Sequence, residues 1–230
     1  MRSNKQPPVT NYVEARGRVI GIGRDGYGNK RFVLFIRGMQ QRRAIYASFA
    51  MPVDVAPGLQ VQDQVEVKGH VVAYLFENEL WNNRNTYTQY MVADEVIQDK
   101  TEIEKAFGYK KGFAYEDPYI RIFLQGEVSN QEVNREAGWT TTTIKIETEE
   151  EERDHEVQVQ YSKNMRVADV KYQLGDTVCV VANLSSKRKN INGEVRNFED
   201  FIVDDIAIID ARERRKKESP LSAMEEALNR

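Results

Sequence analysis

The chain has 230 residues, of which 40% are hydrophobic, and this length suits one large domain or two domains of ~100 residues. Its single cysteine, Cys179, excludes an internal disulfide and any zinc site that needs two thiolates. No stretch approaches the ~20 apolar residues of a membrane span, and the first residues lack the apolar core of a secretory signal. We therefore expect an intracellular, cytoplasmic chain with no membrane contact.

The net charge is −3, but the two signs are unevenly distributed. Residues 1–50 hold ten Lys/Arg and two Asp/Glu, a net charge of +8. Residues 119–210 hold eleven Lys/Arg and eighteen Asp/Glu, a net charge of −7. The distribution of charge is a better indicator than the total charge of where an anionic partner would bind. The first half is the expected place for that partner.

The first hundred residues have the pattern of short strands. Apolar and polar residues alternate, and β-branched and aromatic side chains are frequent. After an opening strand, this pattern predicts strands at 31–37, 43–49, 65–74 and 87–97. A turn rich in glycine (21–31) follows the opening strand. The turn leads into a strand rather than a helix, which excludes a dinucleotide-binding loop.

The second half repeats the order of strands, at 140–146, 155–161, 176–184 and 198–209. Three segment pairs also align at offsets of 109, 113 and 111 residues: 14–19 with 123–128, 59–65 with 172–178, and 90–94 with 201–205. Offsets that agree within four residues indicate one fold used twice. We therefore predict two all-β domains, at 10–98 and 119–210.

Two further segments are predicted to be accessory. Residues 99–118 form a linker with a short helix, which Thr101 would cap. Residues 211–230 form a charged tail whose later apolar residues share one face of a helix.

Five strands in this order, with Gly17 or Gly126 where a bent first strand needs a residue without a side chain, are typical of the OB-fold, a small Greek-key barrel. The segments ARGRV (15–19), GLQVQDQVEVKGHV (58–71) and YMVADEVI (90–97) resemble the OB-fold single-stranded DNA-binding proteins, most of all a phage or plasmid type with tandem barrels. The resemblance implies two OB-like five-stranded barrels that bind single-stranded DNA in replication or recombination, in a bacterial or phage-infected cell.

The outward face of the first barrel is predicted to combine aromatic and basic side chains. Alternation along 31–37 and 43–49 turns Phe32, Leu34 and Ile36 inward and their neighbours outward. Bases stack on rings, at ~1–3 kcal/mol each, while Lys/Arg follow the phosphates. The candidates on this face and on the fourth strand are Arg31, Phe35, Arg37, Arg42, Tyr46 and Lys68. The alternative is that the rings pack against the linker or the other barrel.

Two turns of the first half offer further contacts. The segment 76–87 is expected to be a polar loop over the groove, with Trp81 for stacking and Arg84 for phosphate. The alternative is that Trp81 plugs the end of the barrel. The glycine-rich turn adds Tyr27 and Lys30.

The second half offers fewer candidates. Trp139 stands on a strand whose face has no second ring, and it could equally contact the first barrel. Lys187, Arg188 and Lys189 lie in an expected loop, 185–194, and could equally be solvated. The acidic run 149–152 would repel phosphate. We therefore expect the first barrel to dominate, so that a chain ending near Asp99 keeps most of the affinity.

Catalysis is not predicted, because no nucleophile elbow, Walker loop or HExxH motif is present. We expect no cofactor and no metal site, and Cys179 in the core. The alternatives to DNA binding are an OB-fold module for protein docking and an RNA-binding protein. Expected partners besides single-stranded DNA are replication or recombination proteins, bound through the second barrel or the tail, and a second copy of the chain in a homodimer.

Overall fold

The computed structural model describes residues 11–24, 28–37, 44–52, 54–78, 84–98, 118–146, 155–191 and 194–211, without the side chains of 74–78, 84–88, 187–191 and 194–198. In this part of the chain there are ten strands: β1 (Asn11–Arg24), β2 (Lys30–Ile36), β3 (Ile45–Ala50), β4 (Gln64–Asn78), β5 (Arg84–Gln98), β6 (Tyr119–Asn134), β7 (Trp139–Ile146), β8 (His155–Ser162), β9 (Thr177–Ile191) and β10 (Glu194–Asp210). One short 3-10 helix, η2 (Arg166–Asp169), accompanies them. The predicted all-β class is confirmed.

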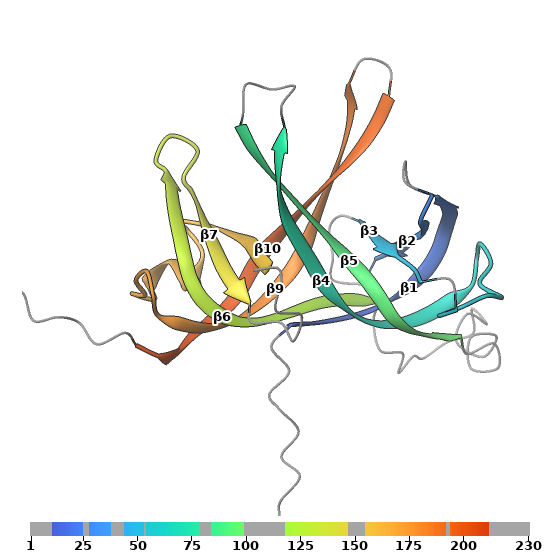
Figure 1. The fold of residues 1–230 in the computed structure, drawn as a ribbon, viewed down its shortest axis with the longest axis horizontal. Helices are drawn as coiled ribbons and strands as arrows, with labels where there is room; N and C mark the ends of the chain where they lie inside the picture. Colours follow the sequence, from blue (N-terminus) through green and yellow to red (C-terminus); the bar gives the residue numbers. More distant parts are fainter. Residues whose placement is uncertain are drawn as a thin grey trace, which may run out of the picture.

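The strands form one large sheet in the order β2-β3-β5-β4-β1-β6-β7-β8-β10-β9. Because β1 also pairs with β2, the strands β1–β2–β3–β5–β4 close into a ring. The pairing of β6 with β9 closes β6–β7–β8–β10–β9 in the same order. Short parallel pairings, β3 with β5 and β8 with β10, complete the rings. Figure 1 shows the β4–β5 and β9–β10 hairpins rising on the same side of the molecule.

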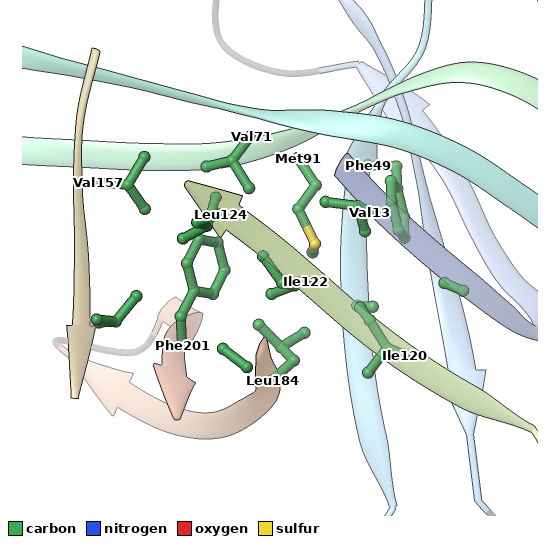
Figure 2. Packing of buried hydrophobic residues seen from close by; sticks show 14 of the residues in the cluster. Val13, Phe49, Val71, Met91, Ile120, Ile122, Leu124, Val157, Leu184 and Phe201 are labelled. Atoms are coloured by element: carbon green, nitrogen blue, oxygen red, sulfur yellow. The ribbon is translucent and has the colours of Figure 1, made fainter. Parts of the chain in front are cut away.

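The two halves are joined by antiparallel pairing of β1 with β6, from Asn11 opposite Leu124 to Arg16 opposite Tyr119. We call this pairing the seam. The buried side chains form a single cluster that includes residues of both halves. Figure 2 shows Val71 and Met91 of the first half near Ile122 and Leu124 of the second. The core therefore runs continuously from one half to the other.

Glycine is required in the first strand of each half. Gly17 lies where β1 passes from β4 to β2, and an added Cβ would be 2.8 Å from the Phe35 carbonyl oxygen. At Gly126 of β6 an added Cβ would overlap the carbonyl oxygen of Lys145. Both strands can cross their neighbours this closely only because the side chain is missing.

The turns before β4 and β9 have matching hydrogen bonds. Val19 exchanges two backbone hydrogen bonds of 2.8 Å with residues 62–63. Val128 exchanges two of 2.9 Å with residues 175–176. These partners are related by the offsets of 109 and 113 residues that align the sequence.

Several expectations about loops and burial are wrong. Most of 76–87 and 185–194 is strand, because the β4–β5 and β9–β10 pairings continue to Asn78 opposite Arg84 and to Ile191 opposite Glu194. Cys179 is partly exposed rather than in the core, because it alternates with fully buried Val178 and Val180 along β9.

The expected linker helix and tail helix lie outside the described residues, apart from 118 and 211 at their edges. Within the described ranges, no helix is long and apolar enough to cross a membrane.

Candidate functional site

Two rings lie side by side on the outer face of β2 and β3. Phe35 is opposite Tyr46 in the register of these strands, and their ring centroids are 5.7 Å apart in an edge-to-face arrangement. Both side chains are partly exposed, whereas their neighbours Leu34 and Ala47 are fully buried. The guanidinium of Arg18, from β1, lies 5.6 Å from the centre of the Phe35 ring. We call Arg18, Phe35 and Tyr46 the ring face.

A second ring and cation stand near this face. The Arg31 guanidinium of β2 lies 5.2 Å from the centre of the Tyr90 ring of β5. Sequence reasoning missed Arg18 and Tyr90. Alternation would have placed Tyr90 outward, because Met91 is a core residue. The position of Arg18 depends on the register between β1 and β2.

The other cations predicted for the site in the first half, where their side chains are described, are more scattered. Arg37 is exposed just after β2, and Lys30 is partly buried at its start. Lys68 of β4 forms an ion pair with Glu95 of β5, with 3.3 Å between Nζ and Oε2. A carboxylate therefore offsets the charge of Lys68, which makes it a weaker phosphate ligand than its sequence position indicates.

Tyr27, Arg42 and Trp81 lie outside the described residues. For Arg84, Lys187, Arg188 and Lys189 the backbone is described but the side chain is not. Arg84 begins β5, and the three cations of the second half belong to β9 rather than to a loop.

Trp139 begins β7 and is 37% exposed. Its register partners are Asn134 of β6 and Ser162 of β8, both in the second half.

The β9–β10 hairpin lies against β3 of the first half. The Tyr46 N–H donates a hydrogen bond to Ser186 Oγ at 2.9 Å, and the Ser48 N–H donates to Glu199 Oε1 at 2.8 Å. Ser186 and Glu199 are directly opposite each other in the hairpin. We call such a pair of opposite residues in two paired strands a rung. This one rung of the second half therefore satisfies two backbone donors of β3 beside the ring face.

The β4–β5 hairpin makes the reciprocal contact on β8. The Gln89 side chain accepts a hydrogen bond from the Gln158 N–H at 2.9 Å and donates one to the Gln158 carbonyl at 3.1 Å. Each half thus uses a hairpin to cover backbone groups on the other half's third strand, at positions outside that strand's short parallel pairing. The sequence carried no signal for these contacts.

Glu199 is a partly buried acid at the contact between the halves. Burial raises the pKa of its carboxyl from 4.5 to about 7, although the Ser48 N–H and the nearby Arg31 guanidinium act to lower it. Near neutral pH, this carboxyl is therefore partly protonated. Among the described residues, no group of three or more His, Cys, Asp or Glu side chains could hold a metal ion.

Neither a family model nor a curated protein matches the chain. Among solved structures, it is similar to the wild-type single-stranded DNA-binding protein from Thermus aquaticus, with a TM-score of 0.53 and 12% identity over 91% of this chain and 98% of that chain. A deletion variant of the same protein gives a TM-score of 0.54 and 12% identity over 90% and 98%. At this identity the likeness concerns the fold, so the chain shares its fold with the Thermus protein.

Proposed function

We propose that the chain binds single-stranded DNA without regard to sequence and without catalytic turnover. The observation that carries this proposal is the ring face, where two partly exposed rings 5.7 Å apart stand with a cation over one of them. Every base has a face that can stack on such rings, so the platform tolerates any sequence. The net charge of +8 over residues 1–50 would attract the phosphates.

We propose further that each half is an OB-type barrel, at 10–98 and 119–210, and that the chain is a tandem of this fold. The same order of pairing in both rings supports this, as does the fold likeness to a single-stranded DNA-binding protein. The known use of OB-folds for oligonucleotides is consistent with the ring face on the second and third strands of the first barrel.

The proposed roles follow from side-chain chemistry. Rings that would stack on bases are Phe35, Tyr46, Tyr27, Trp81 and Trp139, and Tyr90 joins them. Cations that would meet phosphates are Arg31, Arg37, Arg42, Lys30, Arg84, Lys187, Arg188 and Lys189, with Lys68 in a lesser role, and Arg18 joins them.

The proposed setting is replication or recombination in the cytoplasm of a bacterial or phage-infected cell, where single strands arise. The charged tail, 211–230, is the proposed site for a partner protein. Deleting residues 219–230 should then spare DNA affinity and abolish complementation in the host, whereas loss of DNA affinity would contradict this role. A homodimer is the proposed assembly, and sedimentation measures it.

The proposed function is tested by titrating the chain with dT, rU and duplex oligomers of equal length at several salt concentrations. We expect dT to bind well ahead of duplex, with a log–log salt slope of ~0.7 per neutralised phosphate. Equal affinity for duplex, or no dependence on salt, would contradict the proposal. Clear preference for rU would instead support the RNA-binding alternative, and absence of binding the protein-docking alternative.

A further inference from the structure

The ring face is bordered by the second half. Ser186 of β9 and Glu199 of β10 contact the backbone of β3 at Tyr46 and Ser48. The hydrogen bond from the Tyr46 N–H places β9 within hydrogen-bonding distance of a residue whose ring belongs to the ring face. A ligand lying on these rings would therefore meet the β9–β10 hairpin at their side.

The residues that follow this contact in the hairpin are strongly basic. In the register of the two strands, the next rungs pair Lys187 with Phe198, Arg188 with Asn197, and Lys189 with Arg196. Because a strand rises by about 3.4 Å per residue, these rungs lie within about 10 Å of Ser186 along β9. The hairpin thus carries four cations next to its contact with β3, within a half whose net charge is −7.

The described cations nearest the rings already have other contacts. Arg18 lies over Phe35, and Arg31 lies over Tyr90 and close to the carboxyl of Glu199. Arg18 and Arg31 keep their charge in these contacts, but a strand of several nucleotides carries more phosphates than two cations can neutralise. The basic rungs of β9–β10 supply a further concentration of charge beside the contact at Tyr46.

We propose that the single-strand site is composite, with the rings supplied by the first half and the phosphate-binding cations supplied by the β9–β10 hairpin of the second. This inference rests on the proposed function and deepens it. It assigns Lys187, Arg188, Lys189 and Arg196 to the same stretch of DNA that stacks on Phe35 and Tyr46, rather than to a separate site.

The reciprocal contact does not make a second site of this kind. The β4–β5 hairpin meets β8 at Gln158, and the outward residues of β8 are Glu156, Gln158 and Gln160. They include no ring and one carboxylate. β8 itself therefore has no platform for base stacking. The Trp139 ring belongs to the neighbouring β7 and lies opposite Ser162, four residues along β8 from Gln158, so the composite site is expected on the first half alone.

The test uses the full chain and a short dT oligomer of about eight nucleotides, within the ~4–16 that one OB-fold covers. We call the hairpin variant Lys187→Gln/Arg188→Gln/Lys189→Gln the arm variant. It should bind this oligomer at least about tenfold more weakly than the natural chain. The log–log salt slope of its binding should fall by about 2, since each phosphate contributes ~0.7. The matched control is Arg135→Gln/Lys163→Gln/Lys171→Gln, which removes the same charge at exposed positions in turns and a connecting segment of the second half. The control should bind like the natural chain.

The ring variant, Phe35→Ala/Tyr46→Ala, separates one composite site from two sites. At a composite site, either variant alone loses most of the affinity for the short oligomer. At separate sites, the oligomer would use the intact one, so that each variant alone would cost about twofold and only their combination would abolish binding. That second pattern would overturn the inference.

The outcomes also distinguish this inference from the proposed function. If the natural chain fails to prefer dT over duplex, the proposed function itself is wrong. If it prefers dT and the arm variant binds like the control, only the composite site is wrong. Should the arm variant unfold, as circular dichroism would show, Arg188→Gln alone should still lower the salt slope by about 0.7, and an unchanged slope would overturn the inference.

Discussion

Tyr46 joins two functions of the structure in one residue. Its backbone N–H holds the hairpin of the other half, while its ring stands with Phe35 on the outer face. Alternation along the strands placed both rings outward from sequence alone, because Leu34 and Ala47 had to fill the core. The hydrogen bond to Ser186 links residues 140 positions apart, and no local pattern encodes such a contact.

Gln62 has a backbone conformation that favours glycine, with φ at 81°, and the equivalent residue of the second half is Gly175, with φ at 87°. For a residue with a side chain this conformation costs about 1–2 kcal/mol. Glycine avoids that cost, but it loses about 0.5–1 kcal/mol more backbone entropy on folding, which offsets part of the gain. We expect Gln62→Gly to raise stability by about 0.5–1 kcal/mol, or about 1–4 °C in Tm. The reverse change, Gly175→Gln, should lower Tm, and a lower Tm for Gln62→Gly would contradict the explanation.

Glu199 should make stability depend on pH. Because burial raises its pKa from 4.5 to about 7, the folded state binds the proton more tightly than the unfolded state. Its contribution is therefore complete below about pH 4.5 and is lost as pH rises through about 7, a change of about 3 kcal/mol. Burial also raises the pKa of Asp204, which therefore changes stability with pH in the same direction.

Glu199→Gln removes this titration and keeps an acceptor for the Ser48 N–H. Thermal unfolding measured from pH 5 to pH 8 should show Tm falling more steeply for the natural chain than for Glu199→Gln. The control, Glu136→Gln, lies at an exposed turn position and should follow the natural chain. Parallel curves for the natural chain and Glu199→Gln would contradict a raised pKa.

At the scale of elements, the positions of the strands could be predicted from the sequence more accurately than their ends. Alternation revealed the buried central parts of the strands, where every second side chain enters the core. It did not reveal the outer parts of β4, β5, β9 and β10, whose residues are mostly polar, such as 186–190. These extensions pair with one another, and the hairpins they belong to also contact the other half, so their stability comes partly from contacts that no local pattern encodes.

Trp81 falls between the ends of β4 and β5, in residues outside the described ranges. If it stacks on a base, Trp81→Ala should cost ~1–3 kcal/mol of binding, about ten- to hundredfold, with little change in Tm. Trp81→Phe should recover part of the affinity because a ring remains. An unstable variant that binds normally once folded would show that Trp81 has a packing role instead.

At the scale of the molecule, the seam makes the two halves depend on each other. Val13 and Ala15 of β1 are fully buried against Ile120 and Ile122 of β6, and the Tyr12 and Phe123 rings stack across the seam at 6.2 Å. Full burial of one such aliphatic side chain is worth about 1.5–3 kcal/mol. Charge balance alone favours a first half that works by itself, whereas the seam and the hairpin contacts argue against it.

We therefore expect the full chain to unfold in one cooperative transition, and a chain ending near Asp99 to be much less stable and to bind single strands weakly. Calorimetry and titration of both chains measure this. Two separate transitions in the full chain, together with a shortened chain of normal stability and affinity, would show that the halves are independent.

The most direct test of single-strand binding at the ring face is a titration of the natural chain and of Phe35→Ala/Tyr46→Ala with dT oligomers, alongside melting of both. Each lost stacking contact is worth ~1–3 kcal/mol. We predict a loss of about a hundredfold or more in affinity, with both proteins folded at the temperature of the titration. Unchanged affinity in the folded double variant would contradict the ring face as the binding platform.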